Sequence, residues 1–274
     1  MGILNVTPDS FSDGGRFFSL DKALEQAEKM IAEGADIIDV GGESTRPGND
    51  GPVSAEDEIS RVVPVIEALV KLSTDTPISI DTTKSEVATA ALLAGAAIVN
   101  DVSALRFDFY VADAVARENA GLVLMHSRGT PATLHRLPPV ADIMHEVVSS
   151  LGASLKMAER RGVKRESIVI DPGIGFGKSY EQNLELLARL DNLNDAFPGL
   201  PILIGTSRKS FIGRILADES GSPAATDDRT FGTMASITAA VFKGADIVRV
   251  HDVKATVESV KVLDAIKEHT QLNE

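Results

Sequence analysis

The chain of 274 residues contains no cysteine, which excludes disulfides and thiolate metal sites. It also lacks the apolar stretch of about 18 residues that a membrane-spanning helix needs. No basic segment precedes a short apolar one at the N-terminus, so no secretory signal is recognisable. Together these absences predict a cytoplasmic protein without a membrane partner.

Positive charge is also scarce. The chain has 27 Lys and Arg against 40 Asp and Glu, for a net charge of −13. Such a surface repels the phosphates of nucleic acids, so a general nucleic-acid binder is excluded. The five histidines lack the paired spacing of a zinc site, and tightly held zinc is not expected. No linker, low-complexity tract or charge run divides the chain, which predicts one domain over residues 1–274.

What the chain does contain is apolar sequence, 43 % of it, in short runs that alternate with segments of helical periodicity. Eight runs are strand-like: Gly2–Val6, Ile37–Gly41, Ile78–Asp81, Ile98–Asp101, Leu122–His126, Ile168–Asp171, Ile202–Gly205 and Ile247–Val250. The helical segments are Leu20–Glu33, Ser54–Ser73, Lys84–Ala94, Phe109–Asn119, Asp142–Arg161, Ser179–Leu190, Phe231–Lys243 and Lys254–His269. Glycines 34, 95, 121, 162 and 244 are placed where helices end. Eight alternations predict an α/β fold, a single (β/α)8 TIM barrel, for which about 250 residues is typical.

Polar residues close several strand-like runs. In an internal repeat, Asp39, Asn100 and Arg249 each follow a glycine by five positions, and Asp81 and Asp171 end two further runs. The carboxyl ends of barrel strands share one rim, which carries the catalytic residues. We therefore expect these side chains to line one pocket.

The acidic and amide members of this set suit a heterocycle with adjacent N–H groups, because a carboxylate accepts both hydrogens of a guanidine-like edge. Capping by Asp81 or Asp101 would explain one or two of these residues. It would not explain all four of Asp39, Asp81, Asn100 and Asp171.

The basic residues of the same rim come from Ser207-Arg208-Lys209-Ser210, after the seventh strand, and Arg249-Val250-His251, at the end of the eighth. Barrels often bind phosphate between the loops after these two strands, so the residues predict an anionic substrate. The alternative is an ordinary exposed loop.

The segment Asp171–Ser179 is glycine-rich, but Pro172 stands where a P-loop needs glycine, so a nucleotide loop is rejected. One interpretation is a tight turn that is followed by a helix with Ser179 as its cap. The other is a turn whose glycines let a flat ligand approach the backbone, and the two are compatible. For His126, at the end of the fifth strand, a structural and a reactive role are equally open.

Two long polar segments, Thr7–Ser19 and Gly42–Val53, follow the first two strands and are candidate lids. Oxygen atoms of Asn5, Asp9 and Asp13 suit Mg2+ shared with a phosphate.

Together these motifs resemble the dihydropteroate synthase family of folate biosynthesis. Residues 1–15 (MGILNVTPDSFSDGG) match its first signature and residues 39–48 (DVGGESTRPG) its second. Further matches follow in order, at Ser79–Thr82, Asn100–Asp101, Asp171–Gly173, Ser207–Ser210 and Arg249–Asp252, and the resemblance extends to about Ile266.

The resemblance implies a transferase that joins p-aminobenzoate to 6-hydroxymethyl-7,8-dihydropterin pyrophosphate, with Mg2+ as cofactor and a homodimer as assembly. By residue match it assigns catalysis to Asp13, Arg46, Asp81, Asp171 and Lys209. It assigns substrate binding to Phe11, Asp39, Ser44, Thr45, Pro47, Asn100, Ser210, Arg249 and His251, and the metal to Asn5. Within these sets, Asp81, Asn100, Asp171 and Lys209 would hold the pterin, and Arg46, Arg249 and His251 the pyrophosphate.

Two departures from the family pattern stand out. The family usually carries a strand before the first signature, so we expect either an exposed first strand or a missing leading segment. Ser127 stands where many members have methionine, which should alter the shape of the pocket. Two alternatives share the pterin-binding barrel. A methyltetrahydrofolate methyltransferase domain should lack the Ser207–Ser210 loop, and a non-catalytic homologue would bind pterin without releasing pyrophosphate.

Overall fold

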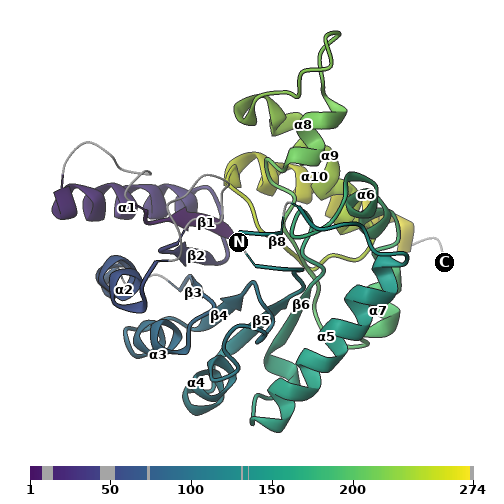
Figure 1. Cartoon of the computed structure of the whole chain (residues 1–274). Coiled ribbons are helices and arrows are strands. Elements are labelled where there is room, and N and C mark those ends of the chain that lie inside the picture. Colours follow the sequence, from purple (N-terminus) through teal and green to yellow (C-terminus); the bar gives the residue numbers. More distant parts are fainter. Residues whose placement is uncertain (8–14, 44–52, 73–74, 131, 135, 272–274) are drawn as a thin grey trace.

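The computed structural model describes residues 1–7, 15–43, 53–72, 75–130, 132–134 and 136–271. Helices surround a central ring of strands (Figure 1). The strands are β1 (Gly2–Asn5), β2 (Ile38–Gly41), β3 (Ile78–Asp81), β4 (Ile98–Asp101), β5 (Gly121–Met125), β6 (Ile168–Asp171), β7 (Leu203–Ile204) and β8 (Ile247–Val248). The helices are α1 (Gly15–Ala32), α2 (Ala55–Lys71), α3 (Ser85–Leu93), α4 (Val111–Glu118), α5 (Ile143–Arg160), α6 (Tyr180–Ala188), α7 (Asp191–Ala196), α8 (Ser210–Ile215), α9 (Thr230–Phe242) and α10 (Val253–Gln271).

Hydrogen bonds between the strands close the ring. Strands β1 to β6 form one parallel sheet in chain order, and β7 pairs with β8. Parallel bridges join the two pieces, one between Ile170 and Ile202 and one between Gly2 and Val250. At the second junction the backbone N–H of Val250 donates to the carbonyl of Met1 at 3.0 Å. The predicted (β/α)8 barrel is confirmed, and β1 lies between β2 and β8 rather than exposed.

Alternation along each strand sorts side chains between the two faces of the barrel wall. Outward residues such as Val40, Ile80 and Ile170 pack against the helices and belong to the main core. A second cluster, formed by buried and partly buried residues at or near the starts of the strands, consists of Met1, Ile37, Ile98, Val123, Val169, Leu203 and Ile247.

This second cluster places the polar residues at the opposite end of the barrel. Two positions after Ile37, Ile98, Val169 and Ile247 come Asp39, Asn100, Asp171 and Arg249. Because side chains two apart in a strand share a face, these four lie on the same face of the wall as the apolar cluster, one layer nearer the carboxyl ends. We call this apolar cluster the floor of the barrel and the layer of polar residues nearer the carboxyl ends of the strands its mouth.

Some predicted boundaries were wrong. Helix α1 begins at Gly15, so the predicted loop Thr7–Ser19 is too long; the glycines and serine near the helix start hid it. Helices α7 and α8 were not expected, since six residues are too few to show helical periodicity. Helix α4 ends at Glu118 and is capped by Asn119, which has φ of 52°, while Gly121 begins β5. None of the described helices is long and apolar enough to cross a membrane.

Candidate active site

Asp39 and Arg249 form the centre of the polar mouth, although 210 positions separate them in the chain. The Nε of Arg249 donates to Asp39 Oδ2 at 2.6 Å, and its Nη2 donates to Asp81 Oδ2 at 2.7 Å. The side-chain amide of Asn100 donates to the same Asp39 oxygen at 3.1 Å. Asp39 is fully buried, and its Oδ1 has no partner among the described residues. One guanidinium therefore joins Asp39 of β2 to Asp81 of β3, and Asp39 connects Asn100 of β4 to the same network.

Burial and charge oppose each other in this network. Burial raises the pKa of Asp81 to about 7, and the neighbouring Arg249 limits the rise. Burial also disfavours the charge of Arg249, but Asp39 and Asp81 outweigh it, so the pKa of Arg249 lies above its ordinary value. Arg249 thus stays charged while Asp81 titrates near neutral pH.

Asp171 and Lys209 make up the other side of the mouth. Asp171 Oδ1 accepts the backbone N–H of Gly173 at 2.7 Å, and burial raises the pKa of Asp171 to about 6. Lys209 Nζ lies 4.0 Å from the centre of the Phe176 ring. Burial, reinforced by Arg249, lowers the pKa of Lys209 to about 8. Phe176 was missed by sequence reasoning, and the available signal was its place inside the glycine-rich run.

The glycines of this run permit close approaches. Gly173 has φ of 67°, and a Cβ at this position would lie 1.8 Å from the carbonyl oxygen of His126. A Cβ at Gly175 would lie 3.1 Å from Cδ of Lys209. Ser179 caps α6 in a capping box with Gln182, so the tight-turn interpretation is confirmed.

Lys178 is turned into the protein rather than toward a phosphate, in agreement with the rejected P-loop. Its Nζ donates to the carbonyl oxygens of Gly173 at 2.8 Å, Phe176 at 3.1 Å and His126 at 3.2 Å, and lies 2.9 Å from His126 Nδ1. Burial and the charge of Lys178 lower the pKa of His126 to about 2. His126 is therefore neutral, and its contacts with Lys178 connect the end of β5 to the turn after β6.

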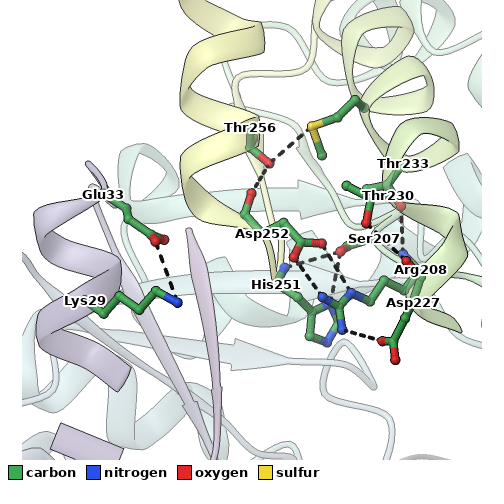
Figure 2. Close-up of polar contacts among 11 residues, drawn as sticks. Lys29, Glu33, Ser207, Arg208, Asp227, Thr230, Thr233, His251, Asp252 and Thr256 are labelled. Carbon is green, nitrogen blue, oxygen red and sulfur yellow. Dashed lines mark hydrogen bonds and ion pairs between the residues drawn. The ribbon is translucent and has the colours of Figure 1, made fainter. Parts of the chain in front are cut away.

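The loops after β7 and β8 supply the remaining basic groups (Figure 2). Ser207 Oγ lies 3.0 Å from His251 Nδ1 and accepts the backbone N–H of His251 at 3.2 Å. Ser210 begins α8 and is exposed. Arg208, expected among the anion-binding residues, forms an ion pair with Asp252 instead.

Two further predicted residues have structural partners. Asp101 accepts the backbone N–H groups of Ser103 at 2.8 Å and Leu105 at 2.6 Å, so it shapes the loop after β4 and leaves Asn100 as the residue in the mouth. The hydroxyl of Ser127 accepts from Arg106 at 2.8 Å.

Asn5, the residue predicted to touch a metal, ends β1 and is half-buried. A Cβ at Gly41 would lie 3.7 Å from Asn5 Oδ1 and 3.6 Å from Cβ of Asp81, so this glycine leaves a small hollow beside the amide oxygen. The described residues include no group of three or more carboxylates or histidines that could hold a metal alone. The other predicted lid residues, Asp9, Phe11, Asp13, Ser44, Thr45, Arg46 and Pro47, lie outside the described residues.

Comparison with known proteins agrees with this geometry. A model described as pterin binding enzyme matches residues 1–251, which defines the class of the chain. The dihydropteroate synthase of Synechocystis sp. is 48 % identical over 266 residues, covering 97 % of this chain and 89 % of the relative. The chain therefore belongs to the dihydropteroate synthase family.

Solved structures give the same result. The dihydropteroate synthase of Clostridium difficile in the presence of pteroic acid matches with a TM-score of 0.88 at 47 % identity, covering 97 % of this chain and 95 % of that one. The Xanthomonas albilineans dihydropteroate synthase with 4-aminobenzoic acid matches with a TM-score of 0.87 at 43 % identity, covering 97 % and 92 %.

Proposed function

We propose that this chain condenses p-aminobenzoate with 6-hydroxymethyl-7,8-dihydropterin pyrophosphate to give 7,8-dihydropteroate and pyrophosphate. The observation that carries the proposal is the mouth itself. Arg249 contacts Asp81 and, through Asp39, Asn100, while Asp171 and Lys209 lie close enough to interact electrostatically with each other and with Arg249. Relatives of the same fold, solved with pteroic acid and with 4-aminobenzoic acid, support the choice of substrates.

The pterin binds with its guanidine-like edge toward the carboxylates, because these groups accept paired N–H donors. Asp171 and Asn100 meet this edge, and Lys209 donates to ring acceptors from the side of Phe176. Arg249, already charged and positioned by Asp39, lies at the pterin face. Phe11, Thr45, Pro47 and Ser210 remain assigned to p-aminobenzoate by their motifs.

The chemistry requires one bond to break and one to form. The bond between the pterin methylene carbon and a pyrophosphate oxygen breaks, and the aniline nitrogen bonds to that carbon and then loses a proton. Since an aniline nitrogen is a weak nucleophile, departure of pyrophosphate leads. Asp81 and Asp171 stabilise the positive charge that develops on the pterin, while Arg46, Arg249 and His251 hold the leaving group.

Mg2+ is part of this proposal. The amide oxygen of Asn5, which lies beside the hollow at Gly41, would hold a hard cation such as Mg2+. Asp13, near the end of the first signature, remains assigned by its motif as a further oxygen donor. When bound, Mg2+ would supply charge neutralisation of the pyrophosphate.

Removal of divalent cations should abolish turnover and spare pterin binding. We expect EDTA to lower kcat at least about 100-fold, because the leaving group loses its charge neutralisation. Binding of 6-hydroxymethylpterin, which lacks pyrophosphate, should persist, since it depends on Asp171 and Asn100. Calorimetry and a pyrophosphate-release assay, with Mg2+ added back, measure both. Full turnover in EDTA would contradict the assignment.

The pH dependence of kcat/KM should be bell-shaped. It should rise through about pH 6 to 7 as Asp171 and Asp81 lose their protons, because the ionised Asp171 accepts the pterin N–H groups and the ionised Asp81 offsets the positive charge that develops on the pterin. It should fall above about pH 8 as Lys209 loses its charge. Lys209→Arg, which stays charged, should extend the alkaline limb upward. An unchanged alkaline limb in this variant would assign the limb to another group.

The experiment that tests the function is pyrophosphate release by the purified chain given the pterin pyrophosphate, Mg2+ and p-aminobenzoate. We expect release that requires all three and yields dihydropteroate. Tight pterin binding without turnover would instead support a non-catalytic pterin-binding homologue. Methyl transfer from methyltetrahydrofolate in place of this reaction would support the methyltransferase alternative.

We also propose that the chain forms a homodimer through α8, α9 and α10. Large apolar side chains are exposed on these helices, at Ile215, Phe231, Phe242, Val262 and Ile266, and at Leu216 directly after α8. Phe231 is 88 % exposed. Exposed apolar residues gathered on neighbouring helices are typical of an interaction surface. Light scattering of the wild type and of Phe231→Ser tests this, and a monomeric wild type would contradict it.

A further inference from the structure

The part of the barrel that carries Lys209 and His251 has the shortest strands. Strands β7 and β8 have two residues each, whereas β1 has four and β5 has five. Past these strands the backbone of Arg249 still donates to the carbonyl of Ile204 at 2.9 Å. Each hydrogen bond described between the two loops that follow involves at least one side chain.

Two consecutive residues of the β7 loop contact two consecutive residues of the β8 loop, as Figure 2 shows. Ser207 Oγ contacts the backbone N–H and Nδ1 of His251. Arg208 donates twice to Asp252, from Nη2 to Oδ1 at 2.7 Å and from Nε to Oδ2 at 3.2 Å. We call these four residues, Ser207, Arg208, His251 and Asp252, the β7–β8 clasp.

The backbone of Arg208 is also fixed by hydrogen bonds. Arg208 has φ of 60°, a left-handed conformation that persists in a non-glycine residue only where its surroundings impose it. Its N–H donates to Thr233 Oγ1 at 3.1 Å, and its carbonyl accepts from Arg229 Nη1 at 2.9 Å. Asp227 also lies 3.6 Å from Nη1 of Arg208. The guanidinium of Arg208 is thus paired with two carboxylates of the protein, those of Asp252 and Asp227.

The placement of the clasp connects two substrate-binding residues. Lys209 directly follows Arg208, and His251 directly precedes Asp252. A shift of one loop against the other would separate the pterin side of the mouth from the pyrophosphate side. A misplacement of about 1 Å in an active site can cost about 100-fold in rate.

We propose that Arg208 and Asp252 are positioning residues, which hold Lys209 in register with His251 so that the pterin and its leaving group are gripped together. The inference rests on the proposed function and deepens it. It assigns Arg208 to the architecture of the site rather than to direct contact with an anionic substrate.

The test is a double-mutant cycle of Arg208→Met and Asp252→Asn. We expect each single variant to lower kcat/KM for the pterin pyrophosphate about 10- to 100-fold. The kcat/KM of the double variant should be no lower than that of the less active single variant, because both substitutions remove the same ion pair. Binding of 6-hydroxymethylpterin should weaken by clearly less than the loss in kcat, since the pterin needs no register with the pyrophosphate side. Asp252→Glu, which keeps the carboxylate, should recover part of the activity.

Direct substrate binding by Arg208 gives a different pattern and would overturn the proposal. Asp252→Asn would then leave activity near that of the wild type, and the effects of the two substitutions would add. Arg189→Met is the matched control, because it removes the exposed ion pair between Arg189 and Glu185 on α6, and its kinetics should stay unchanged. Circular dichroism and thermal unfolding accompany each variant. If Arg208→Met does not fold, Arg208→Lys keeps the charge without the fork geometry and takes its place.

The outcome for the clasp is separable from the outcome for the function. Absence of dihydropteroate formation by the wild type would contradict the function. The positioning role of the clasp is tested separately by calorimetric binding of inorganic pyrophosphate. Arg208→Met and Asp252→Asn should weaken this binding equally. Unchanged pyrophosphate binding in both variants would contradict the clasp.

Discussion

Asp81→Asn should lower kcat about 100- to 1,000-fold while weakening pterin binding much less. Asparagine keeps the shape of the side chain and can still accept from Arg249, so the pocket should survive. What it removes is the negative charge that offsets the cation developing on the pterin methylene. Asp39 continues to hold Arg249, because the Nε contact at 2.6 Å is independent of Asp81.

Asp171→Asn should affect kcat and pterin binding in a different ratio from Asp81→Asn. If Asp171 mainly binds the N–H edge of the pterin, its loss should weaken pterin binding and kcat/KM to a similar extent. Single-turnover kinetics and calorimetry with 6-hydroxymethylpterin measure the two quantities for both variants. Asp113→Asn, on the outer surface of α4, serves as the control and should behave as the wild type. Equal losses of kcat and binding in Asp81→Asn would argue against a dissociative, cation-like path.

Arg249→Met should lower the free energy of unfolding by about 3–5 kcal/mol and eliminate activity. The guanidinium contacts Asp39 and Asp81, and Asp39 is fully buried. Removing the cation leaves a buried carboxylate without compensation. The double variant Asp39→Asn/Arg249→Met should recover most of the stability, because it removes the stranded charge, but none of the activity. Urea unfolding of the wild type, both single variants and the double variant measures this.

The stability deficit of the single variant Arg249→Met should depend on pH. Burial already raises the pKa of Asp81 to about 7, and loss of Arg249 removes the charge that limits this rise. The folded state of Arg249→Met then binds a proton that the unfolded chain, with an ordinary value of 3.8, does not bind at neutral pH. Both folded proteins hold this proton below about pH 7, so the deficit relative to the wild type should be constant near pH 5 to 6 and grow as the pH rises through about 7 toward 8. A deficit that is constant over this range would show that lost packing, rather than stranded charge, sets the cost.

Much of the catalytic face could be predicted from local pattern alone. Asp39, Asn100 and Arg249 each stand two positions after an apolar residue of the barrel floor, and alternation along a strand then places them at one end of the barrel. The glycine-rich turn and its Ser179 cap were equally local. Short elements such as α7 and α8 were missed, because six residues carry too little periodicity.

The partners of these residues could not be predicted, since they depend on barrel closure. Nothing near Asp39 in the chain indicates that Arg249 is its partner; closure brings β8 next to β1 and aims the guanidinium across the mouth. Arg208 is the clearest case. Its motif suggested an anion-binding side chain, yet the left-handed backbone turns it to Asp252.

The sequence by itself thus determined the number and order of the strands, the order of the eight longer helices, the apolar floor and the set of polar residues above it. These follow from periods of 2 and 3.6 residues, which are properties of neighbouring positions. The tertiary structure alone decided which carboxylate meets which cation, which lysine faces the mouth and which is buried in a turn, and how far burial shifts their pKa values. Those outcomes depend on the register between strands distant in the chain and on exclusion of water, and neither is written in any local segment.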